Sequence, residues 1–154
     1  MAFLTISLIV FYIVAIFMPK HISKLQIWSA SLFSLVTECL SDMILDGKLD
    51  LFGYFAKGYQ WAGFLPILLY PPVNTIFLNY YPYQASKWAR LLYMIGWTAF
   101  CLLYEVAALK SKFFYYHHWK LWYSGLCYPV LLFMVLWNFK FTDWLQRRDR
   151  PNSH

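Results

Sequence analysis

The chain alternates between long apolar stretches and short polar connections. Five of these stretches carry few or no charged residues, and each is long enough to form a helix. A helix needs roughly 20 apolar residues to cross the hydrocarbon core of a bilayer. The pattern therefore predicts an all-α polytopic membrane helix bundle that forms a single transmembrane domain over residues 1–154. About five transmembrane helices are expected, near residues 2–18, 26–45, 61–78, 91–109 and 121–139.

Prolines set limits on two of these helices. Pro19, followed by Lys20, is expected to stop the first helix, which we interpret as an uncleaved span because further apolar segments follow it. The pair Pro71 and Pro72 is expected to kink or break the third helix, since proline removes a donor and clashes one turn back. Asn74 is one of the side chains expected to satisfy the carbonyls that such a break leaves free.

The second stretch is the most polar. Glu38, Asp42 and Asp46 are spaced four residues apart and would lie on one face of a helix that ends at Gly47. A charge at mid-span costs about 2.5–3.5 kcal/mol on insertion scales. We therefore expect neighbouring helices to cover this face, with Glu38 turned toward the bundle. If the segment lies at the interface instead, four spans remain.

Composition supports a lipid-facing surface. The chain is 61% hydrophobic and only 13% charged, with a mean hydropathy of +0.47, whereas soluble domains carry about 25% charged residues. The net charge of +6 is expected to reflect connections and a basic C-terminal tail at residues 140–154, and not nucleic acid. The lipid bilayer is the expected partner, together with a membrane protein partner or a second copy of the chain.

The basic residues also predict a topology. Positive residues are enriched on the cytoplasmic side of membrane proteins. Placing the N-terminus outside and the C-terminus in the cytoplasm puts eight of the 13 Lys and Arg residues inside. The expected location is the cell membrane.

Four polar residues form a candidate intramembrane site: Glu38, Asp42, Glu105 and Asn74. One interpretation is a cation or proton site in which the three carboxylates converge in one outward-facing cavity. The other is structural: Asp42 reaches the interface, Glu38 bonds a neighbouring hydroxyl or indole, and Glu105 pairs with Lys110, Lys112 or water.

A second candidate lies in the aromatic and basic stretch 110–125. Lys112, His117, His118 and Lys120 are candidate contacts for anionic lipid headgroups. The alternative is a simple interfacial anchor, in which the rings lie at headgroup level. The adjacent histidines point in different directions on a helix, so a metal site is not expected.

The sequence contains no recognised catalytic or nucleotide-binding motif. We identify no catalytic, cofactor-binding or metal-binding residue, and expect no cofactor. The leading hypothesis is a non-enzymatic membrane component or subunit that acts through protein or lipid contacts. The alternatives are a small cation or proton transporter that uses Glu38, Asp42 and Glu105, and a lipid- or isoprenoid-modifying membrane enzyme.

Several features carry a resemblance to a known group. They are the short uncharged first span, the segment WARLLYMIGW with LLYE in the fourth span, and HHWKLWYSGLCYP before the last helix. In this layout the chain resembles small uncharacterised multipass membrane proteins of Bacillus-type spore-forming bacteria. The resemblance implies a multipass membrane protein, and it implies no reaction and no substrate.

Overall fold

Helices make up most of the structure, a computed structural model that describes residues 2–54, 61–112 and 114–149. The α-helices are α1 (Ala2–Phe17), α2 (Lys24–Asp42), α3 (Tyr70–Tyr80), α4 (Lys87–Lys110) and α5 (Leu121–Asp149). A π-helix, η1 (Met43–Lys48), continues α2, and a 3-10 helix, η2 (Trp61–Leu69), leads into α3. Two short strands, β1 (Phe52–Tyr54) and β2 (Phe114–Tyr116), complete the elements.

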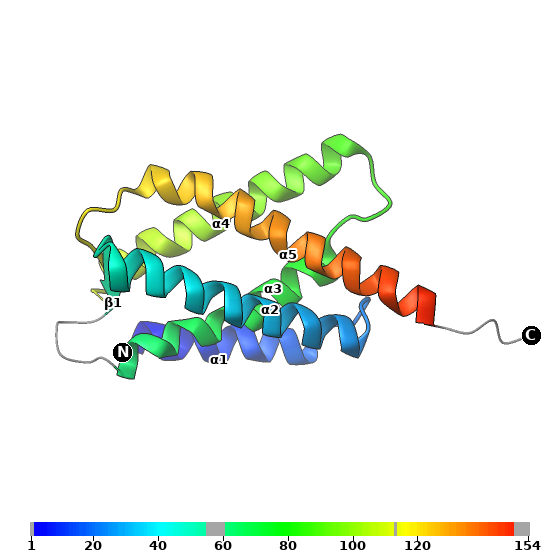
Figure 1. Ribbon diagram of the computed structural model, residues 1–154, viewed down its shortest axis with the longest axis horizontal. Coiled ribbons are helices and arrows are strands. Elements are labelled where there is room, and N and C mark those ends of the chain that lie inside the picture. Colours follow the sequence, from blue (N-terminus) through cyan, green and yellow to red (C-terminus); the bar gives the residue numbers. More distant parts are fainter. Residues whose placement is uncertain (1, 55–60, 113, 150–154) are drawn as a thin grey trace, which may run out of the picture.

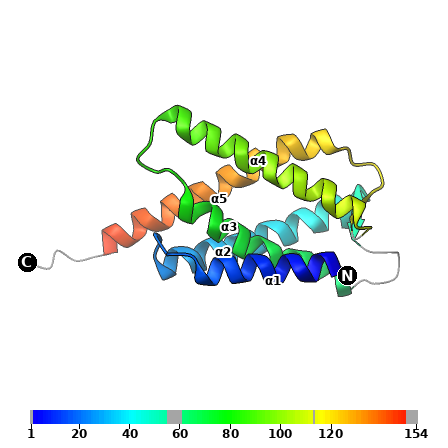
Figure 2. The ribbon, with the colours of Figure 1, turned by 180° about the vertical axis from the view of Figure 1, so that it is seen from behind.

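The helices run back and forth along one axis, so that the start of α1 and the end of α5 lie at opposite ends of the bundle (Figures 1 and 2). Helix α3 lies in the middle and contacts α1, α2 and α5, while α4 packs mainly on α5. The side chains of Phe77 and Leu78 on α3 are fully buried. Tyr93 on α4 donates its hydroxyl hydrogen to the Phe77 carbonyl oxygen at 2.8 Å. Helix α3 therefore forms the centre of the core.

The turn between α1 and α2 is fixed by α3. Helix α1 ends at Phe17, before Pro19, as predicted. The Asn79 amide donates to the carbonyl oxygen of Pro19 at 2.8 Å, and its side-chain oxygen accepts from the backbone N–H of His21 at 2.7 Å. These bonds satisfy backbone groups of the turn itself, which buried backbone N–H and C=O groups require.

The expectation of an all-α fold is wrong in one detail. Strands β1 and β2 form an antiparallel sheet, in which Phe52 pairs with Tyr116 and Tyr54 with Phe114. Aromatic side chains fit a pleated surface well, and these strands consist almost entirely of them. Three-residue strands are too short for an alternating pattern to reveal. The sheet closes the end of the bundle at which η1 and α4 finish.

Helix α2 has its polar face inside and its apolar face outside. The buried side chains are Gln26, Ala30, Ser34 and Glu38, four residues apart. The exposed stripe consists of Leu25, Trp28, Leu32, Val36, Leu40 and Met43. This arrangement is the reverse of that in a water-soluble amphipathic helix, whose apolar face packs on the core. Lipid is the solvent that such a surface suits.

Three helical segments of the described chain are long and apolar enough to cross a membrane: Lys24–Lys48, Lys87–Lys110 and Leu121–Asp149. Helix α1 is apolar but has only 16 residues. The predicted third span is divided into η2 and α3, and the prolines stand at the first positions of α3. Proline is tolerated there because the first N–H groups of a helix have no intrahelical acceptor. Where a kink or break was predicted, the helix changes from 3-10 to α just before Pro71 and Pro72, and its helical backbone continues.

Polar contacts join α2 and α5 at the other end of the bundle. The Gln26 amide donates to the Asp143 carboxylate at 3.1 Å, and the Ser29 and Thr142 hydroxyls lie 2.8 Å apart. Helix α5 continues to Asp149, beyond the predicted end of the last span at residue 139. Residues 150–154 of the predicted basic tail lie outside the described residues.

Candidate functional site

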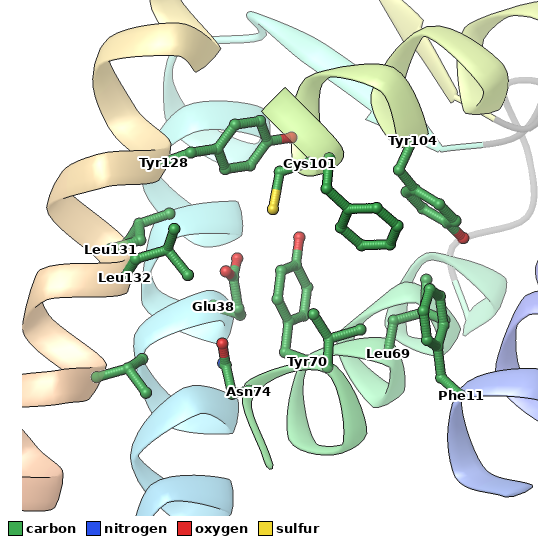
Figure 3. Close-up of a pocket in the computed structure, with 13 residues that line it drawn as sticks. Phe11, Glu38, Leu69, Tyr70, Asn74, Cys101, Tyr104, Tyr128, Leu131 and Leu132 are labelled. Carbon is green, nitrogen blue, oxygen red and sulfur yellow. The ribbon is translucent and has the colours of Figure 1, made fainter. Parts of the chain in front are cut away.

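Glu38 points into the bundle, and only 8% of its surface is exposed. It lines an inner cavity of about 100 Å³ to which all five α-helices contribute. Figure 3 shows its carboxylate directed toward the Tyr70 hydroxyl, with Cys101 and Tyr128 nearby. The inward orientation predicted for Glu38 is thus confirmed, and the group beside it is a tyrosine hydroxyl.

A second, larger cavity begins at the same carboxylate and extends toward the two-stranded sheet. This end cavity has a volume of about 420 Å³. Glu38, Tyr70, Tyr128 and Leu131 line both cavities. Asp42 lines the end cavity but not the inner one. The remaining described residues of its wall are Ser41, Leu45, Phe52, Tyr54, Phe114, Trp119, Ser124, Leu126, Cys127 and Val130.

Carboxylates follow α2 and η1 from the interior to the surface. Asp42 lies 3.5 Å from the hydroxyl of Tyr54, the limit for a hydrogen bond. Asp46 is partly exposed, and Asp50 is exposed and lies 2.7 Å from His117 Nδ1. The predicted helix end at Gly47 is wrong, because η1 continues the helical backbone to Lys48. Asp46 therefore lies in the same continuous helical segment as Glu38 and Asp42.

Burial raises the pKa of Tyr54 well above its ordinary value, and the negative charges of Asp42 and Glu38 add to the effect. Deprotonation of this phenol is disfavoured in a buried setting beside carboxylates. Tyr54 therefore keeps its hydrogen and acts as a donor to Asp42, whose carboxylate lines the end cavity.

Glu105 on α4 is enclosed by hydroxyl donors. Its Oε1 accepts from Tyr116 at 2.6 Å and from Ser124 at 2.7 Å, and its Oε2 accepts from Tyr128 at 2.9 Å. The indole N–H of Trp119 donates to Ser124 Oγ at 2.7 Å. Burial raises the pKa of Tyr116, and the hydrogen bond from Tyr116 to the Glu105 carboxylate adds to this effect. The expected pairing of Glu105 with Lys110, Lys112 or water is wrong, because β2 and α5 supply buried hydroxyls instead.

The three predicted carboxylates are thus brought to one region, with different roles in the wall. Glu38 and Asp42 line the end cavity, whereas Glu105 lies behind it and holds two wall residues, Ser124 and Tyr128. Among the described residues, no group of three or more His, Cys, Asp and Glu side chains is suitable for a metal ion. The arrangement does not resemble a chelating site.

Asn74 is buried beside Glu38 in the inner cavity (Figure 3). Its amide donates to Ser34 Oγ at 2.7 Å, and Ser34 donates to the Ala30 carbonyl oxygen at 2.6 Å. Asn74 therefore joins α3 to α2 one turn from Glu38. The expected role at the proline break belongs to Thr75, whose hydroxyl donates to the Pro71 carbonyl oxygen at 2.7 Å.

The candidate headgroup contacts Lys112, His117, His118 and Lys120 are all exposed and lie around β2. His117 contacts Asp50. Three successive backbone N–H groups, from His117 to Trp119, all point to the carbonyl oxygen of Leu51 at 2.9–3.0 Å. The histidines therefore belong to an ordered loop that closes on the residue before β1, and not to the helix assumed for them.

No pattern in the sequence singles out the tyrosines and the tryptophan of this wall. Tyr54, Tyr70, Trp119 and Tyr128 come from four separate segments, and only Trp119 lies in the stretch 110–125 that the sequence marks as aromatic and basic. A weak signal exists: Ser124 and Tyr128 are spaced four residues apart in the largely apolar first half of α5. Such a pair lies on one helix face and can bond a common partner.

The fold and the cavities define a mostly helical protein with three helices suited to crossing a membrane. The chain matches no known protein family, no curated protein and no solved structure.

Proposed function

We propose that this protein is an integral membrane protein of the cell membrane with five spans, its N-terminus outside and its C-terminus in the cytoplasm. The candidate spans imply contact with a bilayer. The start of α1 and the end of α5 lie at opposite ends of the bundle, which suits an odd number of crossings. The 29 residues of α5 extend over about 43 Å, more than the roughly 30 Å of hydrocarbon. Its final turns, with Arg147 and Arg148, would then project into the cytoplasm.

Within this frame, we propose that the protein is non-enzymatic and exchanges protons or small cations at Glu38. The observation that carries this proposal is the contrast between two buried carboxylates. Glu105 accepts hydrogen bonds from three hydroxyls. Glu38 has one phenol directed at it and lies at the junction of two cavities, and no Lys, Arg or His is among their described lining residues.

A buried carboxylate without a positive partner is costly. A proton or an incoming cation would remove that cost. The groups around Glu38 are Asp42 on its own helix, Tyr70 on α3, Cys101 on α4, Tyr128 on α5 and Tyr54 on β1. Because this surrounding set is acidic or neutral, it favours a positively charged occupant. The carboxylates Asp42, Asp46 and Asp50 would lead that occupant to the surface.

Proton flux into liposomes tests the proposal. The protein is reconstituted into liposomes that contain a pH-sensitive dye, and a membrane potential that is negative inside is imposed. The wild-type protein should admit protons faster than empty liposomes, and Glu38→Gln should reduce the flux to the empty-liposome rate. Asp149→Asn, an exposed carboxylate change at the far end of α5, serves as the matched control and should behave as wild type. Equal flux through wild type and Glu38→Gln would contradict the proposal.

The two other candidate functions, a membrane subunit and a lipid-modifying enzyme, predict different observations. A membrane subunit acting through contacts requires a stable partner, so native mass spectrometry of the solubilised protein should find one. A lipid- or isoprenoid-modifying enzyme requires a polar cavity near headgroup depth. The enzyme hypothesis predicts product formation from added lipid, whereas the exchange proposal predicts none. From the layout of its apolar segments, we also propose that the chain is related to small multipass membrane proteins of spore-forming bacteria.

A further inference from the structure

The wall of the end cavity combines two carboxylates with many aromatic rings. Glu38 and Asp42 provide the carboxylates. The rings come from Phe52, Tyr54, Tyr70, Phe114, Trp119 and Tyr128. We infer that the end cavity binds a small organic ammonium ion, with its charge beside Glu38 and Asp42 and its alkyl groups against the rings. This inference rests on the proposed function and specifies the class of cation.

The size of the end cavity suits such a ligand. Its volume of about 420 Å³ lies within the range of roughly 300–1,000 Å³ that small-molecule sites occupy. The inner cavity, at about 100 Å³, is much smaller. An ammonium ion with several alkyl groups would therefore occupy the end cavity and reach Glu38 from the side of the sheet.

The rings of the wall are held in place by one another. Phe52 lies at the centre of this set, with its ring centroid 5.4 Å from that of Phe114 and 5.8 Å from that of Trp119. The ring centroids of Tyr54 and Phe114 are 5.3 Å apart. The indole of Trp119 is fixed further by its hydrogen bond to Ser124. A wall that is already ordered loses little conformational freedom when a ligand binds.

The chemistry of the wall favours an organic cation over an inorganic one. Ca²⁺ takes six to eight oxygen ligands, and the described residues contain no metal-binding group of three or more His, Cys, Asp and Glu side chains. An alkylammonium ion needs no such shell, because ring faces attract its charge through their quadrupoles. An ammonium ion also needs a negatively charged partner, and Glu38 supplies one. Its side chain is more than nine-tenths buried, and no basic residue is among the described lining residues.

Calorimetry with choline and its uncharged isostere, 3,3-dimethylbutan-1-ol, tests this inference on the full chain in detergent. The two probes have the same shape and differ in charge. Choline should bind and the alcohol should not. Trp119→Leu should weaken choline binding about tenfold, as expected for a desolvated cation–π contact. Glu38→Gln and Asp42→Asn should each weaken it as well. Trp144→Leu, which changes an exposed tryptophan at the other end of α5, should have no effect.

Cysteine labelling provides a second measurement that requires no variant of the acidic residues. Cys127 lines the end cavity, whereas Cys39 lines neither cavity. Choline should slow the reaction of Cys127 with a thiol reagent and leave the rate at Cys39 unchanged. Equal rates at Cys127 with and without choline would overturn the inference.

The outcomes separate this inference from the function on which it rests. Equal binding of choline and the alcohol, no binding of choline, or an unchanged affinity in Trp119→Leu would each overturn the ammonium site. If the same preparation still shows proton flux that depends on Glu38, the proposed function stands and only the inference fails. If flux is absent as well, both fail.

Discussion

The hydroxyl of Tyr128 donates to Glu105 Oε2 at 2.9 Å, while its ring lines both cavities that meet at Glu38. One buried carboxylate therefore positions part of the wall that faces another. The two acids differ in their surroundings and not in their depth, since both are less than a tenth exposed. This difference underlies the separate roles proposed for them.

Glu105→Leu should destabilise the protein. The change leaves the hydroxyls of Tyr116, Ser124 and Tyr128 without their common acceptor, and each unsatisfied buried group costs about 1–3 kcal/mol. We expect a loss of about 3 kcal/mol or more in the free energy of unfolding, measured by denaturant titration in detergent. Glu105→Gln keeps an acceptor oxygen and should cost less. Wild-type stability in Glu105→Leu would show that these hydroxyls find other partners.

Asp50 should tolerate Asn but not Val. Its backbone has φ of 49°, in the left-handed region, which Asn and Asp adopt more readily than other non-glycine residues. Asn also keeps an acceptor near His117 Nδ1. Asp50→Val should lower the unfolding free energy by about 1–2 kcal/mol, and Asp50→Asn by less. Equal thermal stability of the two variants would mean that this backbone conformation is not maintained.

The exposed stripe of α2 should face lipid. Leu32→Lys places a charge in the middle of the helix and should cost about 2.5–3.5 kcal/mol on insertion, reducing the amount of protein in the membrane fraction. Leu25→Lys is the matched control, because Leu25 is equally exposed but stands in the first turn, where a lysine reaches the headgroups. Similar membrane levels for both variants would argue against burial of this face in hydrocarbon.

Topology can be tested with C-terminal fusions. A fluorescent reporter that matures in the cytoplasm should be bright, and an enzyme reporter active only outside should be silent. The reason is the excess of Lys and Arg on the side that carries the end of α5. The opposite result would place the C-terminus outside and reverse the proposed orientation.

The sequence predicted the helices better than the site, for physical reasons. Charge-free stretches and prolines are local signals, so the end of α1 and the position at which η2 changes into α3 followed from them. The burial of Glu38 followed from the cost of facing lipid. The partners of Glu105 could not be predicted from the sequence, because Tyr116 and Ser124 reach it only through the pairing of β2 with β1 and the packing of α4 on α5.

Whether Glu38 exchanges a proton is the central question, and infrared difference spectroscopy between high and low pH addresses it directly. The wild-type protein should gain the C=O stretch of a protonated carboxylic acid as the pH falls. Glu38→Gln should lose a component of that band, and Asp149→Asn should lose none at the position of the Glu38 component. A Glu38→Gln spectrum identical to that of the wild type would contradict the account, because Glu38 would then not change its protonation.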